Sequence, residues 1–440
     1  MCIHSQNRFS CTQAQELAET HMVCCSKTTV LESDCMRSRF VLRPWMKRAM
    51  RLLLILLLLL VLTISMSVTF VEIRRHQTLV LPAPTGHYAV GRIEYDWTDQ
   101  SRYDPLTPHA GLKRELVVWV WYPTMREPGA QVAPYLPSKW AQLSDEQHGF
   151  IGQQLLQSND SIQTHSLDHA PLASTAGRYP VLIFEPGLGN FPTQYTTLLE
   201  DLASHGYIIF AITPTYSSDV VVFPDGRVAE ATPAGSLDNV ADLQEAGNRL
   251  VTIWVKDVVF VLNRLDQLDA TPGNIWSQRL DLARLGVFGH SFGGATAAQV
   301  CQMVARCKAG IDIDGDLFGN VVQTGLEKPF MVIQSDKGSC SDASCRSFQQ
   351  EIGAILRTVP KGERYSISIT GTKHFNFSDY AVSFSPLRAF GLLGSIEGAR
   401  GLEITRVYVA AFFDTALNKT LSPLLQGEAH PYLEVNFSPP

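Results

Sequence analysis

Apolar positions along the chain follow two different patterns. One uninterrupted run, residues 52–71, holds no charged residue and is long enough to cross a bilayer as a helix. Beyond about residue 80, the apolar residues come in short runs rich in branched side chains, which is typical of strands covered on both faces. The predicted strands are 88–95, 116–121, 181–184, 207–212, 285–289, 310–313, 330–333 and 365–369.

Helical patterns lie between several of these strands. A helix is predicted over residues 193–205, because Gly206 follows them and glycine is typical just past a helix end. A second helix is predicted over residues 243–265, where apolar side chains recur at helical spacing. Strands that alternate with helices predict an α/β fold, a mostly parallel sheet with helices on both faces. Two polar stretches, 125–178 and 214–240, interrupt the alternation and are predicted to be insertions over the carboxyl edge of the sheet.

The 440 residues therefore divide into four predicted parts. A basic tail, 1–51, precedes the apolar segment, 52–71; a linker with a first strand, 72–110, leads into a catalytic domain, 111–440. The tail is expected to be disordered, and its cysteine spacing fits no familiar zinc pattern. It contains five of the nine cysteines, namely Cys2, Cys11, Cys24, Cys25 and Cys35.

The apolar segment is flanked by unequal positive charge. Six basic residues precede it closely and only Arg74 and Arg75 follow it closely, so the positive-inside rule leaves the N-terminus in the cytoplasm and exports the rest. If translation begins at Met46, the same run forms a secretory signal that cleavage removes. Retained anchor and cleaved signal both remain open, and both take the catalytic part out of the cytoplasm. The six preceding residues are Arg37, Arg39, Arg43, Lys47, Arg48 and Arg51.

Charge and the remaining cysteines narrow the environment further. A net charge of −6 provides no basic field for nucleic acid. Four cysteines in the exported region allow two disulfides in three pairings. Because bridged Cα atoms lie within about 7 Å, the local pairs Cys301–Cys307 and Cys340–Cys345 are favoured.

One short motif carries the chemistry. The segment Gly289-His290-Ser291-Phe292-Gly293 lies between a predicted strand and a predicted helix, as a nucleophile elbow requires. The turn is so tight that a side chain at Gly289 or Gly293 would collide with the neighbouring strand or helix. Ser291 is therefore the candidate nucleophile, at a helix N-terminus that favours developing negative charge.

A serine nucleophile needs a histidine base and a carboxylate that orients it, in the chain order serine, acid, histidine. His374 follows the last predicted strand, whereas His430 lies in a proline-containing tail, so His374 is the candidate base. Asp314 and Asp336 each follow a predicted strand. Sequence order alone leaves both as candidate acids.

Acyl transfer also needs two N–H donors for the oxyanion. Phe292, directly after the nucleophile, supplies one candidate N–H, and Leu188 in the glycine-containing loop 184–189 supplies the other. Glu185 in this loop is expected near the mouth of the site. No cofactor and no metal are expected, since no carboxylate cluster suggests calcium and His165 and His169 lack a third ligand.

Four motifs in this order resemble the plasma-type platelet-activating factor acetylhydrolase family and its bacterial carboxylic ester hydrolase relatives, over about residues 84–380. The resemblance implies the α/β-hydrolase fold, Asp314 rather than Asp336 as the acid, His374 as the base and Leu188 as an oxyanion donor. The motifs are Gly187-Leu188-Gly189-Asn190-Phe191, Gly289-His290-Ser291-Phe292-Gly293-Gly294, Gly310-Ile311-Asp312-Ile313-Asp314 and His374-Phe375-Asn376-Phe377-Ser378-Asp379.

The function that the resemblance implies is serine-dependent hydrolysis of short-chain or phospholipid-type carboxylic esters through an acyl-enzyme. The expected partners are a lipid ester substrate and, through the apolar segment, a membrane. An acyltransferase with the same three residues is an alternative, as is a catalytically silent, membrane-tethered binding protein. Retention of the nucleophile, base, acid and both oxyanion loops argues against the silent protein.

Overall fold

The computed structural model describes residues 43–126, 128–147, 157–175, 177–338, 343–383, 385–426 and 431–437. Contacts divide the chain into two units, Met1–Ile64 and Ser65–Pro440. The expectations for residues 1–42, Cys340 and His430 fall outside the described residues.

A single long helix, α1 (Pro44–Arg75), contains the predicted apolar segment. Its stretch Pro44–Ile73 has a mean hydropathy of 2.8 in its most apolar window, and the side chains of that window are exposed. About 20 apolar residues are enough to cross a bilayer. The helix is therefore long and apolar enough to cross a membrane.

Within the described residues of the larger unit, a twelve-stranded sheet has the order β1-β5-β2-β3-β7-β6-β10-β11-β12-β13-β14, with β4 paired to β5. The central strands from β7 to β13 pair in parallel. The strands are β1 (Leu79–Val80), β2 (Ala89–Tyr103), β3 (Lys113–Thr124), β4 (Val132–Pro134), β5 (Ile162–Asp168), β6 (Tyr179–Glu185), β7 (Ile208–Thr213), β10 (Leu280–His290), β11 (Ala309–Ile313), β12 (Phe330–Ser335), β13 (Arg364–Ile369) and β14 (Val435–Phe437), with β8 (Val220–Val222) and β9 (Val228–Glu230) forming a separate hairpin.

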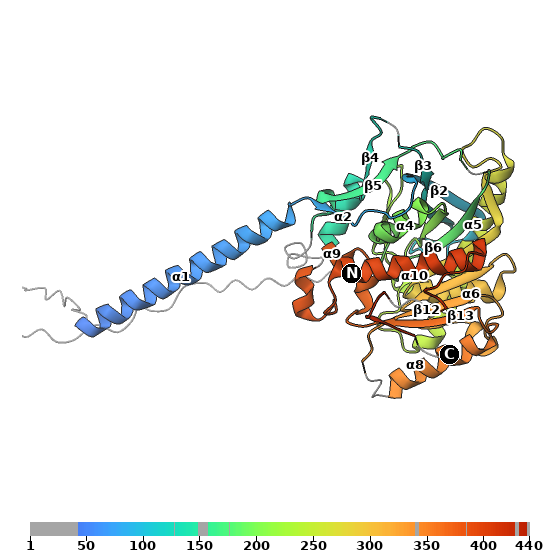
Figure 1. Cartoon of the computed structure of the whole chain (residues 1–440). Coiled ribbons are helices and arrows are strands. Elements are labelled where there is room, and N and C mark those ends of the chain that lie inside the picture. The colour runs from blue at the N-terminus through green and yellow to red at the C-terminus, as the bar shows by residue number, and fades with distance from the viewer. Residues whose placement is uncertain are drawn as a thin grey trace, which may run out of the picture. The chain divides into compact units, whose positions relative to one another are not determined.

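Helices cover both faces of this sheet because its central strands are apolar on both sides. In β6, Leu182 and Phe184 belong to one buried cluster, whereas Val181 and Ile183 belong to the other. The first face packs against α4 (Thr196–Ser204) and α10 (Gly398–Asn418), and α10 crosses in front of the sheet in Figure 1. The second packs against α5 (Leu243–Ala270), α6 (Phe292–Met303) and α8 (Ala343–Thr358).

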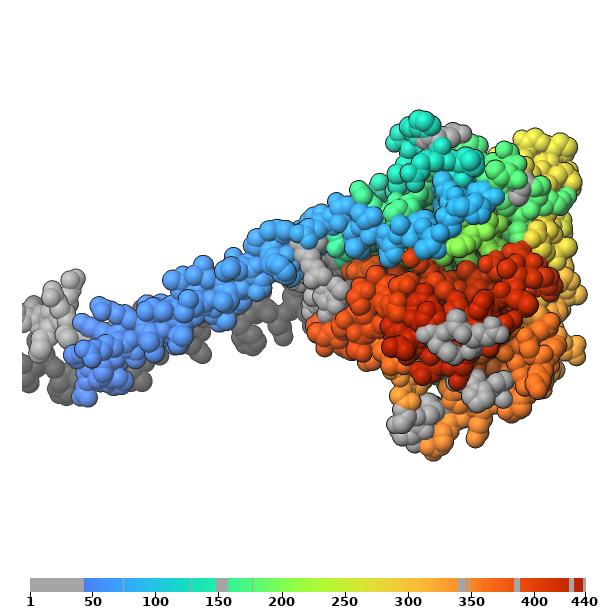
Figure 2. Space-filling view, viewed as in Figure 1, coloured from blue at the N-terminus to red at the C-terminus, as the bar shows by residue number. Residues whose placement is uncertain are grey.

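In Figure 2, drawn from the same side, α10 and the segments that follow it lie on the surface that faces the viewer, in red. The predicted α/β fold, with its mostly parallel sheet, is confirmed. The remaining helices are short: α2 (Ser138–Gln147), α7 (Val321–Thr324), α9 (Tyr380–Ser383), and the 3-10 turns η1 (Asn159–Ser161), η2 (Pro192–Tyr195), η3 (Pro233–Gly235), η4 (His374–Phe377) and η5 (Ser385–Phe390).

The two predicted insertions differ in what they add. The stretch 214–240 contains a hairpin, β8 and β9. The stretch 125–178 was expected over the carboxyl edge, but its β4 and β5 extend the sheet beside β2. The polar β5 is stabilised by buried Glu200 of α4, which accepts hydrogen bonds from the backbone N–H groups of His165 and Ser166 at 2.8 and 2.7 Å.

One of the two favoured disulfides is present. Cys301 of α6 is bonded to Cys307, just before β11, with the two Cα atoms 5.1 Å apart. Both side chains are buried. The bond joins the end of the helix that follows Ser291 to the start of the next strand.

Replacement of Cys301 and Cys307 together by alanine is expected to lower the free energy of unfolding by about 2 kcal/mol, because a short loop is no longer closed in the unfolded chain. Denaturant unfolding of both proteins under oxidising conditions measures the difference. A reductant should destabilise the wild type more than the double variant. Equal stability of the two oxidised proteins would contradict a structural role for this bond.

Candidate active site

The turn from β10 into α6 is strained at one residue. Ser291 lies between the last residue of the strand and the first residue of the helix, with φ 56° and ψ −125°. A Cβ atom at Gly289 would overlap the backbone of Gly293, and one at Gly293 would overlap the carbonyl oxygen of Glu185. Positive φ at a non-glycine residue is costly and is found mainly where the surroundings impose it. These close approaches hold Ser291 in its strained conformation.

The position of Ser291 before a twelve-residue helix determines its electrostatics. The first N–H groups of a helix have no carbonyl partner within the helix, and Phe292 carries the first of them. Together they place partial positive charge beside the serine hydroxyl. Negative charge that forms on an atom at this position is therefore stabilised.

Backbone pairing places Ser291 and Asp314 at the same edge of the sheet. β10 and β11 run parallel and end opposite one another at His290 and Ile313. The N–H of Ser291 donates to the carbonyl of Ile313 at 2.8 Å, and the N–H of Asp314 donates to the carbonyl of Ile333 at 2.7 Å. The two residues therefore leave neighbouring strands side by side, at the carboxyl edge.

Asp314 is hydrogen-bonded to His374. His374 Nδ1 lies 2.8 Å from Asp314 Oδ2, and the other carboxylate oxygen accepts from the N–H and the hydroxyl of Ser335, each at 2.9 Å. Lys337 Nζ lies 3.2 Å from the same oxygen. Burial acts to raise the pKa of Asp314, but the hydrogen bond from His374 and the charge of Lys337 outweigh it and lower the pKa to about 2. Asp314 is an ionised carboxylate.

The loop after β13 presents His374. Its Nδ1–H points at a carboxylate that can only accept, so the neutral imidazole has an unprotonated Nε2. The His374 side chain is 41% exposed, and this nitrogen can therefore accept a proton from a neighbouring group.

Asp336 contacts a different part of this loop. Its carboxylate accepts from the N–H of Gly371 at 2.8 Å and from the N–H of Gly338 at 2.9 Å. Its own N–H donates to the carbonyl of Thr372 at 3.2 Å. The structure thus brings Asp314 to the imidazole, whereas Asp336 anchors the backbone that leads to His374.

The loop that follows β6 is held on both sides of Leu188. The Gly187 N–H donates to the Tyr195 hydroxyl at 3.1 Å. The Gly189 N–H donates to the Ser217 carbonyl at 2.9 Å, and the Gly189 carbonyl accepts from Asp219 N–H at 2.8 Å. No acceptor for the Leu188 N–H lies among the described residues, which leaves this group available to a ligand.

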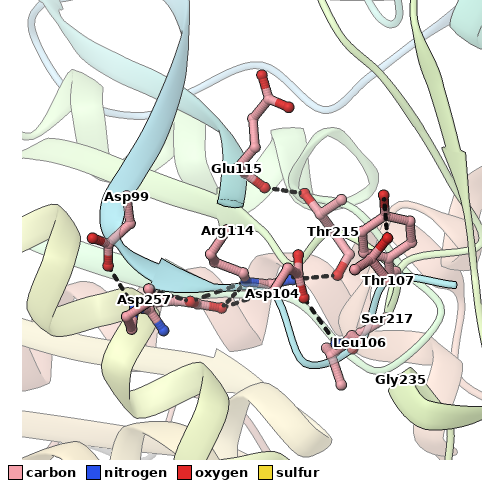
Figure 3. Close-up of polar contacts among 12 residues, drawn as sticks. Asp99, Asp104, Leu106, Thr107, Arg114, Glu115, Thr215, Ser217, Gly235 and Asp257 are labelled. Atoms are coloured by element: carbon pink, nitrogen blue, oxygen red, sulfur yellow. Dashed lines mark hydrogen bonds and ion pairs between the residues drawn. The ribbon is translucent and has the colours of Figure 1, made fainter. Parts of the chain in front are cut away.

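A buried ion-pair network supports the segment that pairs with Gly189. Figure 3 shows Arg114 between Asp257 and Asp104, with its guanidinium also donating to the Thr215 carbonyl. The distances are 2.6 Å to Asp257, 3.1 Å to Asp104 and 2.7 Å to the carbonyl. Arg114 is completely buried, so its charge needs these partners. Through the Thr215 carbonyl, the network holds the first residue of the segment 215–219 in place.

Trp254 of α5 connects residues 215–219 to Phe292, the other candidate oxyanion donor. The Trp254 indole N–H donates to the Ser217 hydroxyl at 3.3 Å. Its ring meets the Phe292 ring edge to face, with centroids 4.9 Å apart. Leu188 and Phe292 are thereby supported by one continuous set of buried contacts.

A pocket of about 640 Å³ opens beside Leu188 and Gly189. Its walls are polar and apolar in about equal parts and come mostly from the predicted insertion 214–240. Burial and the charge of Asp238 raise the pKa of Asp219 to about 6. The polar side chains that line it are Ser217, Asp219, Thr232, Ser236, Asp238 and Asn239.

Glu185 is not at the mouth of the site as expected. Its side chain is fully buried, and neither carboxyl oxygen has a hydrogen-bond partner among the described residues. Burial, with the charge of Asp257, raises its pKa well above the ordinary value, although Arg114 opposes this. Alternation along β6 places Glu185 on the same face as Val181 and Ile183, which directs this carboxyl into the core.

Sequence reasoning missed Ser335 and Lys337 beside Asp314, and Tyr195 and His290 behind the site. The only feature of the sequence that could have indicated Ser335 and Lys337 was their position just after the predicted strand 330–333. Within the described ranges, no three His, Cys, Asp or Glu side chains gather as metal ligands would.

The chain is similar over most of its length to known carboxylic ester hydrolases. A family model described as platelet-activating factor acetylhydrolase, isoform II, matches residues 73–225 and 266–423. A probable 1-alkyl-2-acetylglycerophosphocholine esterase of Arthroderma benhamiae is 26% identical over 394 residues, covering 82% of this chain and 94% of the relative. The platelet-activating factor acetylhydrolase of Canis lupus familiaris is 26% identical over 365 residues, covering 77% of each chain.

A solved structure shares the fold. The ferulic acid esterase of Streptomyces cinnamoneus superimposes with a TM-score of 0.67 at 29% identity, covering 82% of this chain and 99% of that one. The predicted α/β-hydrolase fold and the resemblance stated from the motifs are both confirmed. Because the family match extends over most of its length, the chain belongs to the platelet-activating factor acetylhydrolase, isoform II, family.

Proposed function

We propose that this chain hydrolyses short-chain or phospholipid-type carboxylic esters through an acyl-enzyme formed on Ser291. Its family and its structural neighbour are those of carboxylic ester hydrolases. The observation that carries the proposal is the 2.8 Å hydrogen bond between His374 Nδ1 and Asp314 Oδ2, at the sheet edge where Ser291 occupies a strained turn.

In the first half of the reaction, Ser291 Oγ attacks the ester carbonyl carbon while His374 Nε2 takes the hydroxyl proton. Asp314 keeps the imidazole in the required tautomer and stabilises its charged form. The tetrahedral intermediate then breaks its bond to the alcohol, which receives the proton from His374. In the second half, water adds to the acyl-enzyme by the same route, and the free acid leaves.

The oxyanion is assigned to two backbone N–H groups. Phe292 provides one at the start of α6, and Leu188 provides the other from the loop after β6. The absence of a described acceptor for Leu188 and the helix N-terminus at Phe292 support this assignment. Such preorganised donors are worth about 3 kcal/mol each in comparable enzymes.

The proposed substrate class follows from the relatives. The fungal relative is named as an esterase of 1-alkyl-2-acetylglycerophosphocholine, and the mammalian relatives as platelet-activating factor acetylhydrolases. We propose that the substrate of this chain is likewise a phospholipid with a short acyl group. The ferulic acid esterase neighbour supports testing small aromatic esters as well.

We also propose that α1 either anchors the enzyme in a membrane, with the catalytic part outside the cytoplasm, or is removed as a signal. The length and hydropathy of Pro44–Ile73 support both forms. The N-terminal sequence of the mature protein separates them, and protection of residues 65–440 from external protease in intact cells would sink both.

Removal of the Asp314 charge is expected to lower kcat by about 10⁴-fold, because Asp314→Asn no longer holds the imidazole in the reactive tautomer. Steady-state hydrolysis of p-nitrophenyl acetate measures the loss. Asp336→Asn is the matched control. Asp336 accepts backbone N–H groups through both of its oxygens in the described structure, from Gly338 and from Gly371. Asparagine keeps one of these two acceptors, and the variant keeps Asp314 beside His374, so most of its activity should remain. The reverse ranking would move the acid to Asp336.

Asp314 is also expected to shape acid stability. A carboxyl whose pKa is lower in the folded protein stabilises it above the unfolded value, and this contribution disappears as pH falls through the folded value. For Asp314 the window runs from 3.8 down to about 2. Over this window the free energy of unfolding should fall more steeply in the wild type than in Asp314→Asn, as denaturant titrations at successive pH values would show. Parallel curves would contradict the lowered pKa.

Ser291 should react with a fluorophosphonate probe, and Ser291→Ala should lose labelling and about 10⁶-fold in kcat. A panel of p-nitrophenyl esters from acetate to palmitate, with an oxidised phospholipid, then measures chain-length preference. Acetate and the phospholipid are expected to react faster than palmitate. Folded wild-type protein that is not labelled at Ser291 would refute the proposed mechanism.

A further inference from the structure

A buried chain of hydrogen bonds runs behind the candidate nucleophile. The Tyr195 hydroxyl lies 3.1 Å from the Gly187 N–H, 3.0 Å from Asn190 Nδ2 and 2.8 Å from His290 Nδ1. His290 Nε2 in turn lies 3.0 Å from the His374 carbonyl oxygen. The chain therefore joins the loop before Leu188 to the backbone of the candidate base.

Each hydrogen bond in this chain has only one possible direction. The His374 carbonyl can only accept, so His290 Nε2 carries the proton and donates. In the neutral ring, His290 Nδ1 is then an acceptor and receives the Tyr195 hydroxyl proton. The Tyr195 oxygen accepts from Gly187 and Asn190, whose N–H groups can only donate. Each of these four hydrogen bonds therefore joins one donor to one acceptor.

Burial keeps this pattern in place. Tyr195 and His290 are each only 1% exposed. Burial, together with the nearby His374, lowers the pKa of His290 to about 3, so the ring stays neutral at physiological pH. The imidazole rings of His290 and His374 pack with centroids 4.5 Å apart.

The chain reaches three parts of the site at once. At one end it fixes Gly187, directly before Leu188. At the other end it fixes the backbone of His374, whose imidazole contacts Asp314. In the middle, His290 is the residue directly before Ser291. A shift of the Tyr195 hydroxyl would therefore move a candidate oxyanion donor and the candidate base relative to the nucleophile.

We propose that Tyr195 and His290 are positioning residues that hold the Leu188 loop and His374 in register with Ser291. The inference rests on the roles proposed above for these three residues. It adds two residues that touch no substrate and act through the hydrogen bonds between them.

Tyr195→Phe tests the chain most directly in the full-length protein, because it removes the hydroxyl and keeps the ring that packs against Phe184 at 4.9 Å. With p-nitrophenyl acetate, kcat per active site should fall about 10- to 100-fold, since small misplacements of reacting groups are costly. KM should change less than about 2-fold, because uniform binding is not lost. Titration with the fluorophosphonate probe measures the concentration of active sites. Dividing the rate by this concentration corrects kcat for any unfolded protein.

Tyr122→Phe is the matched control. Tyr122 is as buried as Tyr195, and its hydroxyl donates to the Ala170 carbonyl at 2.6 Å, in the cluster on the opposite face of the sheet. It should lose stability and keep its kcat per active site. A kcat for Tyr195→Phe equal to that of Tyr122→Phe would overturn the inference.

Two replacements of His290 test the positioning role of this residue. They also keep the inference testable if Tyr195→Phe does not fold. Glutamine retains a donor and an acceptor at the end of its side chain, whereas leucine has neither. His290→Gln should therefore keep more kcat per active site than His290→Leu, and equal values would overturn the inference. In His290→Leu, adding Tyr195→Phe should cost little more, because both changes break one chain; fully additive losses would count against it.

These results are separable from failure of the proposed mechanism. If Ser291→Ala or Asp314→Asn retained activity, the assigned site itself would be wrong. If both lost activity while Tyr195→Phe kept its kcat, only the positioning role would fall.

Discussion

The hydrogen bond from the Ser291 N–H to the Ile313 carbonyl extends the pairing of β10 and β11 by one residue beyond their ends. The same extension joins Asp314 to Ile333 of β12. Both residues have positive φ, 56° at Ser291 and 54° at Asp314, so the backbone turns sharply at both places as it leaves the sheet. Parallel pairing thus converts separation along the sequence into adjacency at one edge, and the rest of the site is arranged around that edge.

Two aspartates near this edge have opposite protonation behaviour. Asp314 lies past the end of β11 and is held ionised by His374, Ser335 and Lys337. Asp312, two residues earlier, is buried within the strand, where burial raises its pKa well above the ordinary value and the Gly315 N–H is a donor to one oxygen. The pKa of the same chemical group is therefore raised or lowered according to the partners that the fold supplies.

The site depends on buried polar contacts as much as on its reactive residues. Arg114 with its two aspartates supports the segment next to Gly189, and Tyr195 with His290 supports the opposite side of the loop and the backbone of His374. Both sets are almost free of solvent. In such surroundings an unpaired polar group is costly, which favours one arrangement of the loops over many.

The sequence by itself determined the central strands, the elbow at Ser291 and the His374 loop, because apolar runs and glycine spacing are local consequences of burial and close approach. It also indicated the Cys301–Cys307 pair through its short separation. Strand β5, which lies between β1 and β2, was missed because its buried Ser166 is polar and bonds to Glu200, a residue from a distant helix. Strand order left Asp314 and Asp336 open as the acid, and only the resemblance favoured Asp314; the folded sheet brings Asp314 to His374. Tertiary structure alone decided that Glu185 faces the core and that His290 bonds to Tyr195. Each of these depends on which side chains the folded sheet brings within hydrogen-bond distance, and no pattern within a single segment contains that information.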